Sequence, residues 1–278
     1  MSVIKVPQQV AMTIAGSDPS GGAGIQADLK TFTMVGVYGG AVITCLTAQN
    51  TNGVFAVQTV DPPFVKHQIE TVLSDLDVTH IKIGMLGSAA VANCTCEALA
   101  DFNGEIICDP VLLASSGQEL IDEKGYDVVR TKLLDICTVI TPNLPELSTL
   151  TGGQNCESRE SLLKAAEILL QRHEKLRAVI ITGGHFKAAN NSITDYLFSF
   201  SPPSRTVDCL EVSHSRIASS NTHGTGCTFS AAFTAYHILT GDDSKAFYKT
   251  TQYMDAIIKK SIHFKIGHGT GPLLHHLR

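Results

Sequence analysis

Short apolar segments alternate with amphipathic segments along most of this chain of 278 residues. The apolar segments have the length and the β-branched content of buried strands. They cover residues 9–16, 37–48, 54–60, 80–84, 105–109, 137–141, 178–182, 195–200 and 206–213. The amphipathic segments predict helices over residues 25–35, 64–73, 89–102, 120–134, 144–150, 158–173, 226–240 and 244–264. Such alternation predicts an α/β fold with a doubly wound, mainly parallel central sheet flanked by helices on both faces.

Four of the predicted strands end in polar residues or glycine, at Gly16-Ser-Asp18, Asp109-Pro110, Pro142-Asn143 and Gly183-Gly184. Because ligands of open α/β sheets bind beyond the carboxyl ends of the strands, we expect the functional site at this edge. No repeat or linker interrupts the pattern, so residues 1–278 are expected to form one domain. Residues 1–9 are an N-terminal extension, and residues 267–278 form a glycine- and histidine-rich tail, with His268, His275 and His276 expected at the surface.

Charge and cysteine content exclude several classes of function. The chain carries 21 Lys and Arg against 26 Asp and Glu, without a long basic cluster, which argues against nucleic acid or an anionic membrane as a partner. Its eight cysteines are dispersed, and several lie in apolar segments, as is typical of reduced thiols. The first nine residues lack the apolar core of a signal peptide, and no apolar run reaches the length of a membrane span. We therefore expect a cytoplasmic protein.

A glycine turn opens the predicted helix over residues 226–240. It lies in the stretch Asn221-Thr-His-Gly-Thr-Gly-Cys227. Glycine tolerates positive φ, and the first turn of a helix directs unpaired N–H groups and a favourable dipole at an anion. The stretch therefore predicts a phosphate-binding cradle with the Cys227 thiol beside it. A capped helix with a buried structural cysteine is the alternative.

A second glycine loop follows the first predicted strand. Gly22-Ala-Gly24-Ile-Gln-Ala27 fits the dinucleotide-binding pattern in form, but the acidic residue expected about twenty residues later is missing. A nicotinamide-dependent dehydrogenase is therefore disfavoured. The loop also lacks the Gly-Lys-Ser/Thr of a P-loop. A loop that encloses the substrate is the favoured interpretation, with a purely structural turn as the alternative.

Three polar side chains suggest a magnesium site. Asp109 ends an apolar strand, and Asn143 and Glu146 follow the strand over residues 137–141. Oxygen ligands from all three would suit Mg²⁺, which binds few carboxylates together with water and phosphate. A capping box between Asn143 and Glu146 is the structural alternative. Asp28 lies one turn inside the helix over residues 25–35, where it could simply complement the helix dipole.

Taken together, the motifs resemble one family. The stretches that carry the likeness are Gly16 to Phe32, Ala48-Gln-Asn50, Lys82-Ile-Gly-Met-Leu86, Asp109-Pro-Val111, Thr141-Pro-Asn-Leu-Pro-Glu146, Gly183-Gly-His185, Asn221 to Cys227 and Gly267-His-Gly-Thr-Gly-Pro272. In this order they resemble the hydroxymethylpyrimidine/phosphomethylpyrimidine kinases of thiamine biosynthesis, which belong to the ribokinase-like superfamily. The resemblance covers nearly the whole chain.

The resemblance implies a role for each matching residue. It implies an anion hole from Gly224, Thr225 and Gly226, with Cys227 as the catalytic base. It implies a pyrimidine site from Gly16, Asp28, Gln49, Met85 and Val111, and it implies that Asn143, Glu146, Thr182 and Gly184 bind the nucleotide. Asp109 and Glu146 would hold the metal. ATP, Mg²⁺, a small-molecule pyrimidine substrate and a homodimer follow from the same resemblance.

Two positions depart from the family. Thr182 and Ser115 stand where relatives often carry a lysine that contacts the nucleotide phosphates, and Lys187 is a candidate substitute. These departures keep a non-catalytic pyrimidine-binding protein as an alternative. A pyridoxal kinase is the nearer alternative, and Gln49 favours the pyrimidine. From the position of Cys227 at a helix N-terminus, we expect a lowered thiol pKa and a thiolate near neutral pH.

Overall fold

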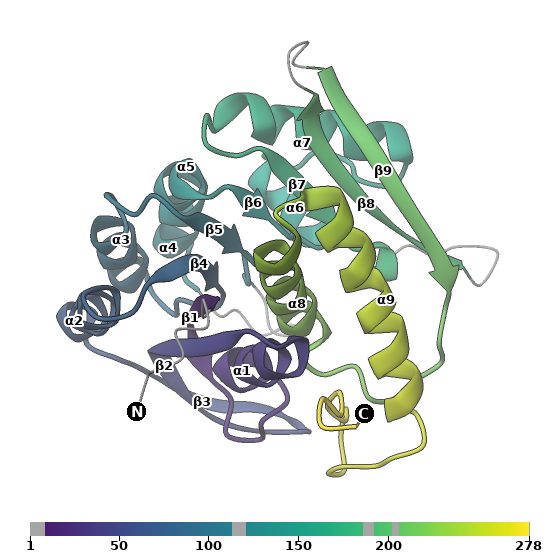
Figure 1. Ribbon diagram of the computed structural model, residues 1–278, viewed down its shortest axis with the longest axis horizontal. Helices are drawn as coiled ribbons and strands as arrows, with labels where there is room; N and C mark the ends of the chain where they lie inside the picture. The colour runs from purple at the N-terminus through teal and green to yellow at the C-terminus, as the bar shows by residue number, and fades with distance from the viewer. Residues whose placement is uncertain (1–8, 113–120, 186–191, 202–205, 278) are drawn as a thin grey trace, which may run out of the picture.

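A mixed sheet forms the centre of the molecule (Figure 1), in a computed structural model that describes residues 9–112, 121–185, 192–201 and 206–277. Within these residues, nine strands are ordered β3-β2-β1-β4-β5-β6-β7-β8-β9. They are β1 (Val10–Ser17), β2 (Tyr38–Asn50), β3 (Gly53–Thr59), β4 (Val78–Ile83), β5 (Glu105–Cys108), β6 (Val139–Ile140), β7 (Ala178–Ile181), β8 (Ser192–Ser201) and β9 (Thr206–Ser215). The strands from β2 to β7 are parallel, whereas β3, β8 and β9 are antiparallel to their neighbours. The predicted mainly parallel sheet is confirmed.

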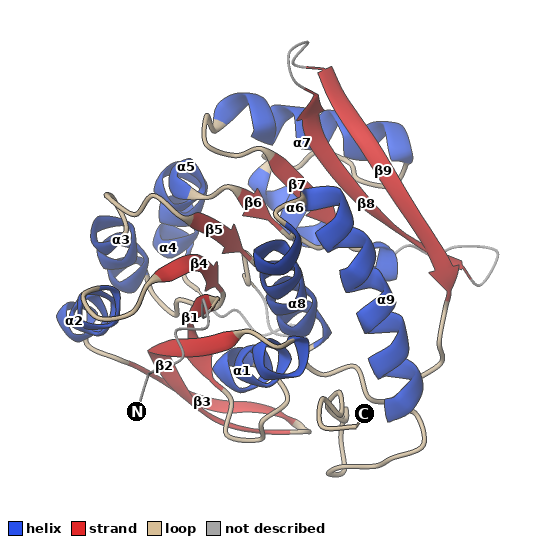
Figure 2. Ribbon diagram, in the orientation of Figure 1, coloured by secondary structure: helices blue, strands red, loops and turns tan. Residues whose placement is uncertain are grey.

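Helices cover both faces of the sheet (Figure 2). One face carries α1 (Gly24–Val35), α8 (Thr225–Thr240) and α9 (Asp243–Ser261), which pack side by side. The other carries α2 (Pro62–Leu73), α3 (Ala89–Ala98), α4 (Glu123–Val128), α5 (Leu134–Ile136), α6 (Leu144–Leu150) and α7 (Arg159–Arg172). The doubly wound arrangement expected from the alternating pattern is therefore confirmed.

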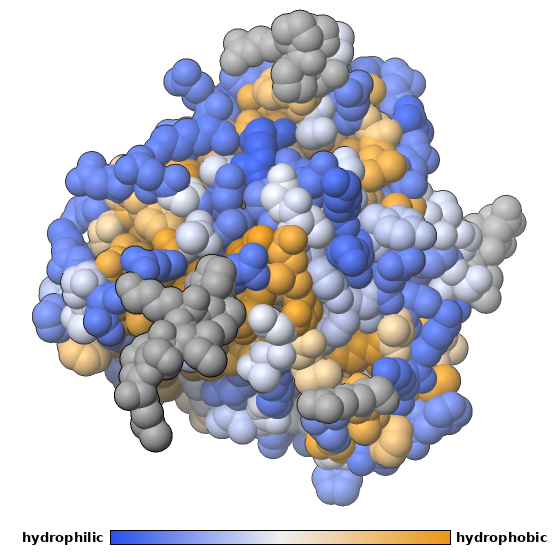
Figure 3. All heavy atoms as spheres, viewed as in Figure 1, coloured by the Kyte–Doolittle hydropathy of each residue, from blue (hydrophilic) through white to orange (hydrophobic). Residues whose placement is uncertain are grey.

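The central strands are buried on both faces, which explains their nearly continuous apolar sequence. In β5, Ile106 packs with the cluster beneath α2, α3 and α7, while Ile107 packs with the cluster beneath α8 and α9. In β7, Val179 and Ile180 divide in the same way. On the face shown in Figure 3, apolar side chains gather near the middle, and polar side chains dominate the margin.

Several element boundaries differ from the sequence-based prediction. The segment between the strands predicted over residues 37–48 and 54–60 is shorter than expected, because Asn50 pairs with Gly53 and extends β2. The helix predicted over residues 89–102 ends at Ala98, since Leu99 leaves helical geometry. The helix predicted over residues 120–134 contains a π-helical turn, Val129–Leu133, between α4 and α5. Both Val129 and Leu133 still face the core, so apolar spacing alone does not reveal the wider turn.

Gly24 begins α1 at a point where two backbone segments touch. Its φ is +56°, and an added Cβ would lie 2.2 Å from the carbonyl oxygen of Gly16. Gly36, just after the same helix, has φ +95° but faces open space. The two positions therefore separate the cost of a left-handed backbone from the cost of a clash.

We expect Gly36→Ala to lower the free energy of unfolding by about 1–2 kcal/mol, the cost of a left-handed alanine. Gly24→Ala should lower it distinctly more, because the backbone clash adds to that cost. Urea denaturation of both variants measures the difference. Equal losses would show that the contact between Gly24 and Gly16 does not constrain the fold.

A polar cluster lies at the amino ends of the strands. Arg177 is held by Glu105 and Asp243, and its Nη2 lies 3.1 Å from Nε2 of His237. Since a guanidinium only donates, His237 accepts there and carries its proton on Nδ1. That Nδ1 lies 2.8 Å from Nε2 of His80, so both imidazoles are neutral in this arrangement. Burial, followed by repulsion from His237, lowers the pKa of His80 to about 4.

This cluster predicts acid sensitivity. The folded pKa of His80 lies below its ordinary value of 6.5, so the unfolded chain takes up a proton first as the pH falls. The free energy of unfolding has its full value above pH 6.5. Towards pH 4 it falls by about 2 kcal/mol, after discounting for solvent screening. Urea titrations across this range should show the slope, and His80→Gln should flatten it. An unchanged slope in the variant would contradict the assignment.

Candidate active site

Two glycine loops meet beyond the carboxyl ends of β1 and β4. Gly224 has φ +81°, and an added Cβ would lie 1.8 Å from the carbonyl oxygen of Gly22. Only glycine allows this approach. Gly224 is the N-cap of α8, and the N–H groups of Thr225, Gly226 and Cys227 open the helix without a side-chain cap, although that of Thr225 donates to the Thr222 carbonyl oxygen at 3.3 Å. The anion cradle predicted from the sequence therefore has the required backbone geometry.

Asp18 holds the first of these loops together. Its carboxylate accepts hydrogen bonds from the backbone N–H groups of Ser20, Gly22 and Ala23 and contacts His223 of the second loop. Burial alone would raise its pKa, but these hydrogen bonds, that of His223 foremost, lower the pKa of Asp18 to about 2. A buried carboxylate therefore joins the two loops. Sequence analysis assigned no role to Asp18 or His223.

Asp28 forms a fully buried ion pair with Lys82. The Lys82 Nζ lies 3.0 Å from Asp28 Oδ2, and Thr13 donates to the same oxygen at 2.6 Å. Asp28 thus does not complement the dipole of α1 at its N-terminus. Its Oδ1 has no partner among the described residues. The carboxylate is 0% exposed, so its contact with a pyrimidine stays a prediction.

Lys82 is the cation that sequence analysis missed. Burial opposes its charge, but attraction from Asp28, Cys227 and Asp109 raises the pKa of Lys82 above its ordinary value. The ammonium group therefore stays charged at the centre of the site. The available signal was its position inside the apolar strand over residues 80–84, because a buried lysine requires an anionic partner.

The Cys227 thiol is protonated at neutral pH, contrary to the expected thiolate. Burial raises the pKa of Cys227 to about 12, and the negative charges of Asp109 and Asp28 add to this effect. Lys82 lowers the pKa but does not overcome burial. The expectation considered the helix N-terminus alone, and it was wrong because desolvation and nearby carboxylates act more strongly here.

Asp109 and Glu146 form a pair of buried carboxylates. Ser230 donates to Asp109 Oδ2 at 3.4 Å, and a Cβ added to Gly226 would lie 3.8 Å from the same oxygen. Burial raises the pKa of Asp109 to about 6. Burial, with repulsion from Asp109, raises the pKa of Glu146 to about 8. Lys82 lowers the pKa of Asp109 but does not offset burial, so the two carboxylates are not fully neutralised by positive charge.

The capping box proposed for Asn143 and Glu146 is present. The Asn143 side chain accepts from the backbone N–H of Glu146, and the Glu146 side chain accepts from that of Asn143, both at 2.9 Å. In the described part of the chain, no three His, Cys, Asp or Glu side chains are grouped as metal ligands. Two carboxylates that lack a counter-charge still fit Mg²⁺, which completes its shell with water and phosphate.

The expected nucleotide residues follow β7. Thr182 is half-buried, and the Gly183 N–H donates to Asp195 Oδ1 at 2.8 Å. Arg216 donates to the Gly184 carbonyl oxygen from both guanidinium nitrogens, each at 3.2 Å. This places an arginine on the segment that follows Thr182. Ser115 and Lys187 lie outside the described residues.

The other expected pyrimidine contacts lie near the two loops. A Cβ added to Gly16 would lie 3.4 Å from Met85 Sδ, so these two residues share one wall. Val111 follows Asp109, and its N–H donates to the Asp109 carbonyl oxygen at 2.8 Å. Gln49 lies near the end of β2, with its amide 3.2 Å from His223. Gly16 and Met85 are therefore neighbours, and Gln49 lies against His223, while the binding of a pyrimidine by these residues stays a prediction.

The C-terminal tail packs behind the anion cradle. The His223 N–H donates to the Gly271 carbonyl oxygen, and Thr228 in the first turn of α8 bonds to His275 at 2.9 Å. His275 is buried, so its predicted surface position was wrong, while His268 and His276 are exposed. The error arose because glycine and histidine content does not reveal that the tail supports a buried helix end.

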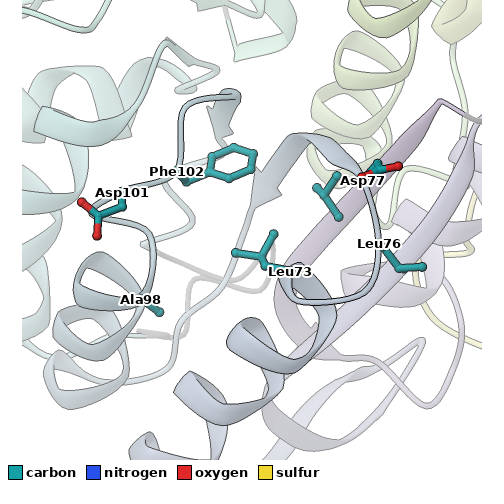
Figure 4. A pocket seen from close by; sticks show the side chains of 7 residues that line it. Leu73, Leu76, Asp77, Ala98, Asp101 and Phe102 are labelled. Carbon is teal, nitrogen blue, oxygen red and sulfur yellow. The ribbon is translucent and has the colours of Figure 1, made fainter.

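A cavity of about 400 Å³ lies elsewhere, between the ends of α2 and α3 (Figure 4). It is lined by Leu73, Leu76, Asp77, Val78, Ala98, Asp101 and Phe102. Val78 begins β4, whereas the site described above lies beyond the last residue of that strand. This cavity therefore does not belong to the candidate active site.

Comparisons with known proteins agree with this geometry. The model of the phosphomethylpyrimidine kinase family matches residues 18–274. The hydroxymethylpyrimidine/phosphomethylpyrimidine kinase of Escherichia coli is 37% identical, over 95% of this chain and 96% of its own. The thiamine biosynthesis bifunctional protein ThiED of Geobacter sulfurreducens is 40% identical over 97% of this chain, which spans 52% of that longer protein.

Solved structures show the same fold. Phosphomethylpyrimidine kinase from Clostridium difficile is 33% identical with a TM-score of 0.76, covering 90% of this chain and 99% of its own. An ADP complex of Bacillus subtilis pyridoxal kinase is 32% identical with a TM-score of 0.83, covering 96% and 97%. Both proteins are kinases, and their fold is ribokinase-like. With the family match over residues 18–274, this shows that the chain belongs to the phosphomethylpyrimidine kinase family.

Proposed function

We propose that this protein phosphorylates hydroxymethylpyrimidine and then its monophosphate with ATP, in thiamine biosynthesis. The observation that carries the proposal is the uncapped N-terminus of α8, which faces the buried Asp109. This arrangement provides N–H groups for a phosphoryl group beside a site for a cation. Phosphoryl transfer depends mainly on such positioning and charge stabilisation. The names of the curated relatives support the choice of substrate.

In the proposed reaction, different residues would bind the phosphoryl group, hold Mg²⁺ and accept the proton. The N–H groups of Thr225, Gly226 and Cys227 would bind the transferring phosphoryl group. Asp109 and Glu146 would hold Mg²⁺, which neutralises phosphate charge when bound. Once its own thiol proton has passed to solvent, Cys227 would take the proton of the substrate hydroxyl as that oxygen attacks the γ-phosphorus and ADP leaves. Lys82 favours the thiolate form of Cys227 that this step needs.

Pyridoxal kinase is the second candidate function. It is favoured by the TM-score of 0.83 to the Bacillus subtilis pyridoxal kinase, which also supports ATP as the phosphoryl donor because that structure holds ADP. Gln49 supports the pyrimidine as the preferred substrate, since its amide lies beside His223 near the anion cradle. The two substrates therefore need a direct comparison.

With Mg²⁺-ATP, we expect the purified protein to phosphorylate hydroxymethylpyrimidine and its monophosphate, each assayed separately. We expect kcat/KM for the pyrimidine to exceed that for pyridoxal by at least about tenfold. Product formation is followed by chromatography, with heat-inactivated protein as the control. Tight pyrimidine binding without product would favour the non-catalytic alternative, and a preference for pyridoxal would favour the second candidate.

Cys227 provides a second test. We expect Cys227→Ala to lower kcat by about 10²–10⁴-fold, the usual contribution of a general base, while pyrimidine binding persists. In the ligand-free protein, alkylation of Cys227 by iodoacetamide should rise with pH from 7 to 10 without a plateau, because its pKa is about 12. Peptide mass spectrometry distinguishes this thiol from the other seven. Near-normal kcat in the variant would remove Cys227 from the base role, and an alkylation plateau below pH 8 would contradict the raised pKa.

The proposal includes a cytoplasmic homodimer that binds neither nucleic acid nor membrane. All eight cysteines are free of disulfides, which suits a reducing compartment. Tyr38, Leu46 and Phe55 on β2 and β3 are exposed apolar side chains that support self-association. Among the described helices, none is long and apolar enough to cross a membrane.

A further inference from the structure

His223 stands between two side chains that compete for one ring nitrogen. Its Nε2 lies 2.8 Å from Oδ2 of Asp18 and 3.2 Å from the amide of Gln49. The three residues come from different elements: the loop after β1, the strand β2 and the turn before α8. Asp18 is buried, with 3% of its surface exposed.

The Asp18 carboxylate determines whether Nε2 of His223 carries a proton. Asp18 can only accept, so His223 Nε2 carries a proton and donates it, whether or not the ring is charged. A protonated Nε2 cannot accept a hydrogen bond. The structure has Gln49 Nε2 towards His223 and Oε1 towards Thr47, which sets two donors against each other at 3.2 Å. The amide end that faces His223 is therefore assigned as the oxygen.

The other end of the amide leads to the same result. Thr47 Oγ1 lies 3.0 Å from the carbonyl oxygen of Ser17 and 3.1 Å from the second end of the Gln49 amide. The hydroxyl has one proton, and the carbonyl can only accept it. Thr47 must then accept from Gln49, whose amide nitrogen faces it. A half-turn of the amide, which changes no shape, satisfies both neighbours.

We propose that Asp18 and His223 are positioning residues that fix the amide orientation of Gln49 and thereby select an aminopyrimidine substrate. This inference rests on the proposed function. The fixed amide keeps one acceptor site on its oxygen and one N–H beside it. An aminopyrimidine offers an amino donor next to a ring-nitrogen acceptor, which complements this pair. In the aminopyrimidine, the carbon that bears the amino group is bonded to the ring nitrogen. In pyridoxal, a further ring carbon lies between the ring nitrogen and the carbon that bears the hydroxyl, so the match is lost.

The same contact links substrate choice to the anion cradle. His223 immediately precedes Gly224, and its N–H donates to the Gly271 carbonyl oxygen of the tail. Asp18 also holds the N–H groups of Gly22 and Ala23. Because Asp18 supports so much of the loop, its replacement would change the cradle as well. His223 and Thr47 are therefore the better positions for a test.

Three variants separate positioning from a structural role. His223→Leu removes the donor, His223→Gln keeps a donor amide, and Thr47→Val removes the opposite anchor with little change in shape. For His223→Leu we expect KM for hydroxymethylpyrimidine to rise about tenfold, as for the loss of one hydrogen bond, with a smaller change in kcat. The response to pyridoxal should stay within about twofold. His223→Gln should keep most of the preference for the pyrimidine over pyridoxal. Thr47→Val should reduce this preference, as His223→Leu does.

Two measurements do not depend on turnover. Calorimetry of the pyrimidine and of pyridoxal gives the same comparison as binding constants, so it tests the inference even if the wild-type protein forms no product. Long-range ¹H–¹⁵N spectra of the wild-type protein should show His223 protonated at Nε2. Thermal unfolding confirms that each variant is folded.

These experiments distinguish failure of the inference from failure of the proposed activity. An unprotonated Nε2, or an equal fall in kcat for both substrates with unchanged KM, would overturn the inference and confine His223 to the anion cradle. An unaltered preference in folded His223→Leu would overturn it too. Absence of product from the wild-type protein, together with a selective loss of pyrimidine binding in His223→Leu, would reject the proposed activity while supporting the inference.

Discussion

The ion pair between Asp28 and Lys82 is the interaction on which the site depends. Both side chains are fully buried, and they join α1 to β4 directly beneath the two glycine loops. Removal of one partner from such a pair leaves an uncompensated charge, at a cost of about 3–5 kcal/mol. Its field extends further, because Lys82 also acts on Asp109 and Cys227. Lys82 therefore both stabilises the buried ion pair and affects the charge of the neighbouring groups.

The neighbouring charges explain why ligands would complete this site. Asp109 and Glu146 have raised pKa values because burial, repulsion of Asp109 by Asp28 and repulsion of Glu146 by Asp109 are not offset by a second cation. A protonated Cys227 follows from the same excess of negative charge and from burial. Binding of a divalent cation would relieve the carboxylates and, through them, the thiol. The ligand-free protein therefore holds its catalytic groups in a state suited to bind cations before it reacts.

Backbone contacts between the two glycine loops shape the rest of the proposed site. The approach of Gly224 to Gly22 brings the anion cradle against the loop that Asp18 organises. His223, at the junction, reaches Asp18 and Gln49 with one nitrogen. Under the proposed function, substrate recognition and phosphoryl binding would be parts of one hydrogen-bonded unit. The tail supports this unit through His275 and Gly271.

The sequence by itself determined the succession of strands and helices along the chain and the family, because these follow from local periodicity and from ordered motifs. It also predicts the edge of the sheet at which the site is proposed. It also placed Cys227 at the start of a helix. Only the tertiary structure decided the charge state of Cys227, the pairing of Lys82 and the orientation of Gln49. Each of these depends on desolvation and on contacts between residues far apart in the chain, which no local pattern records.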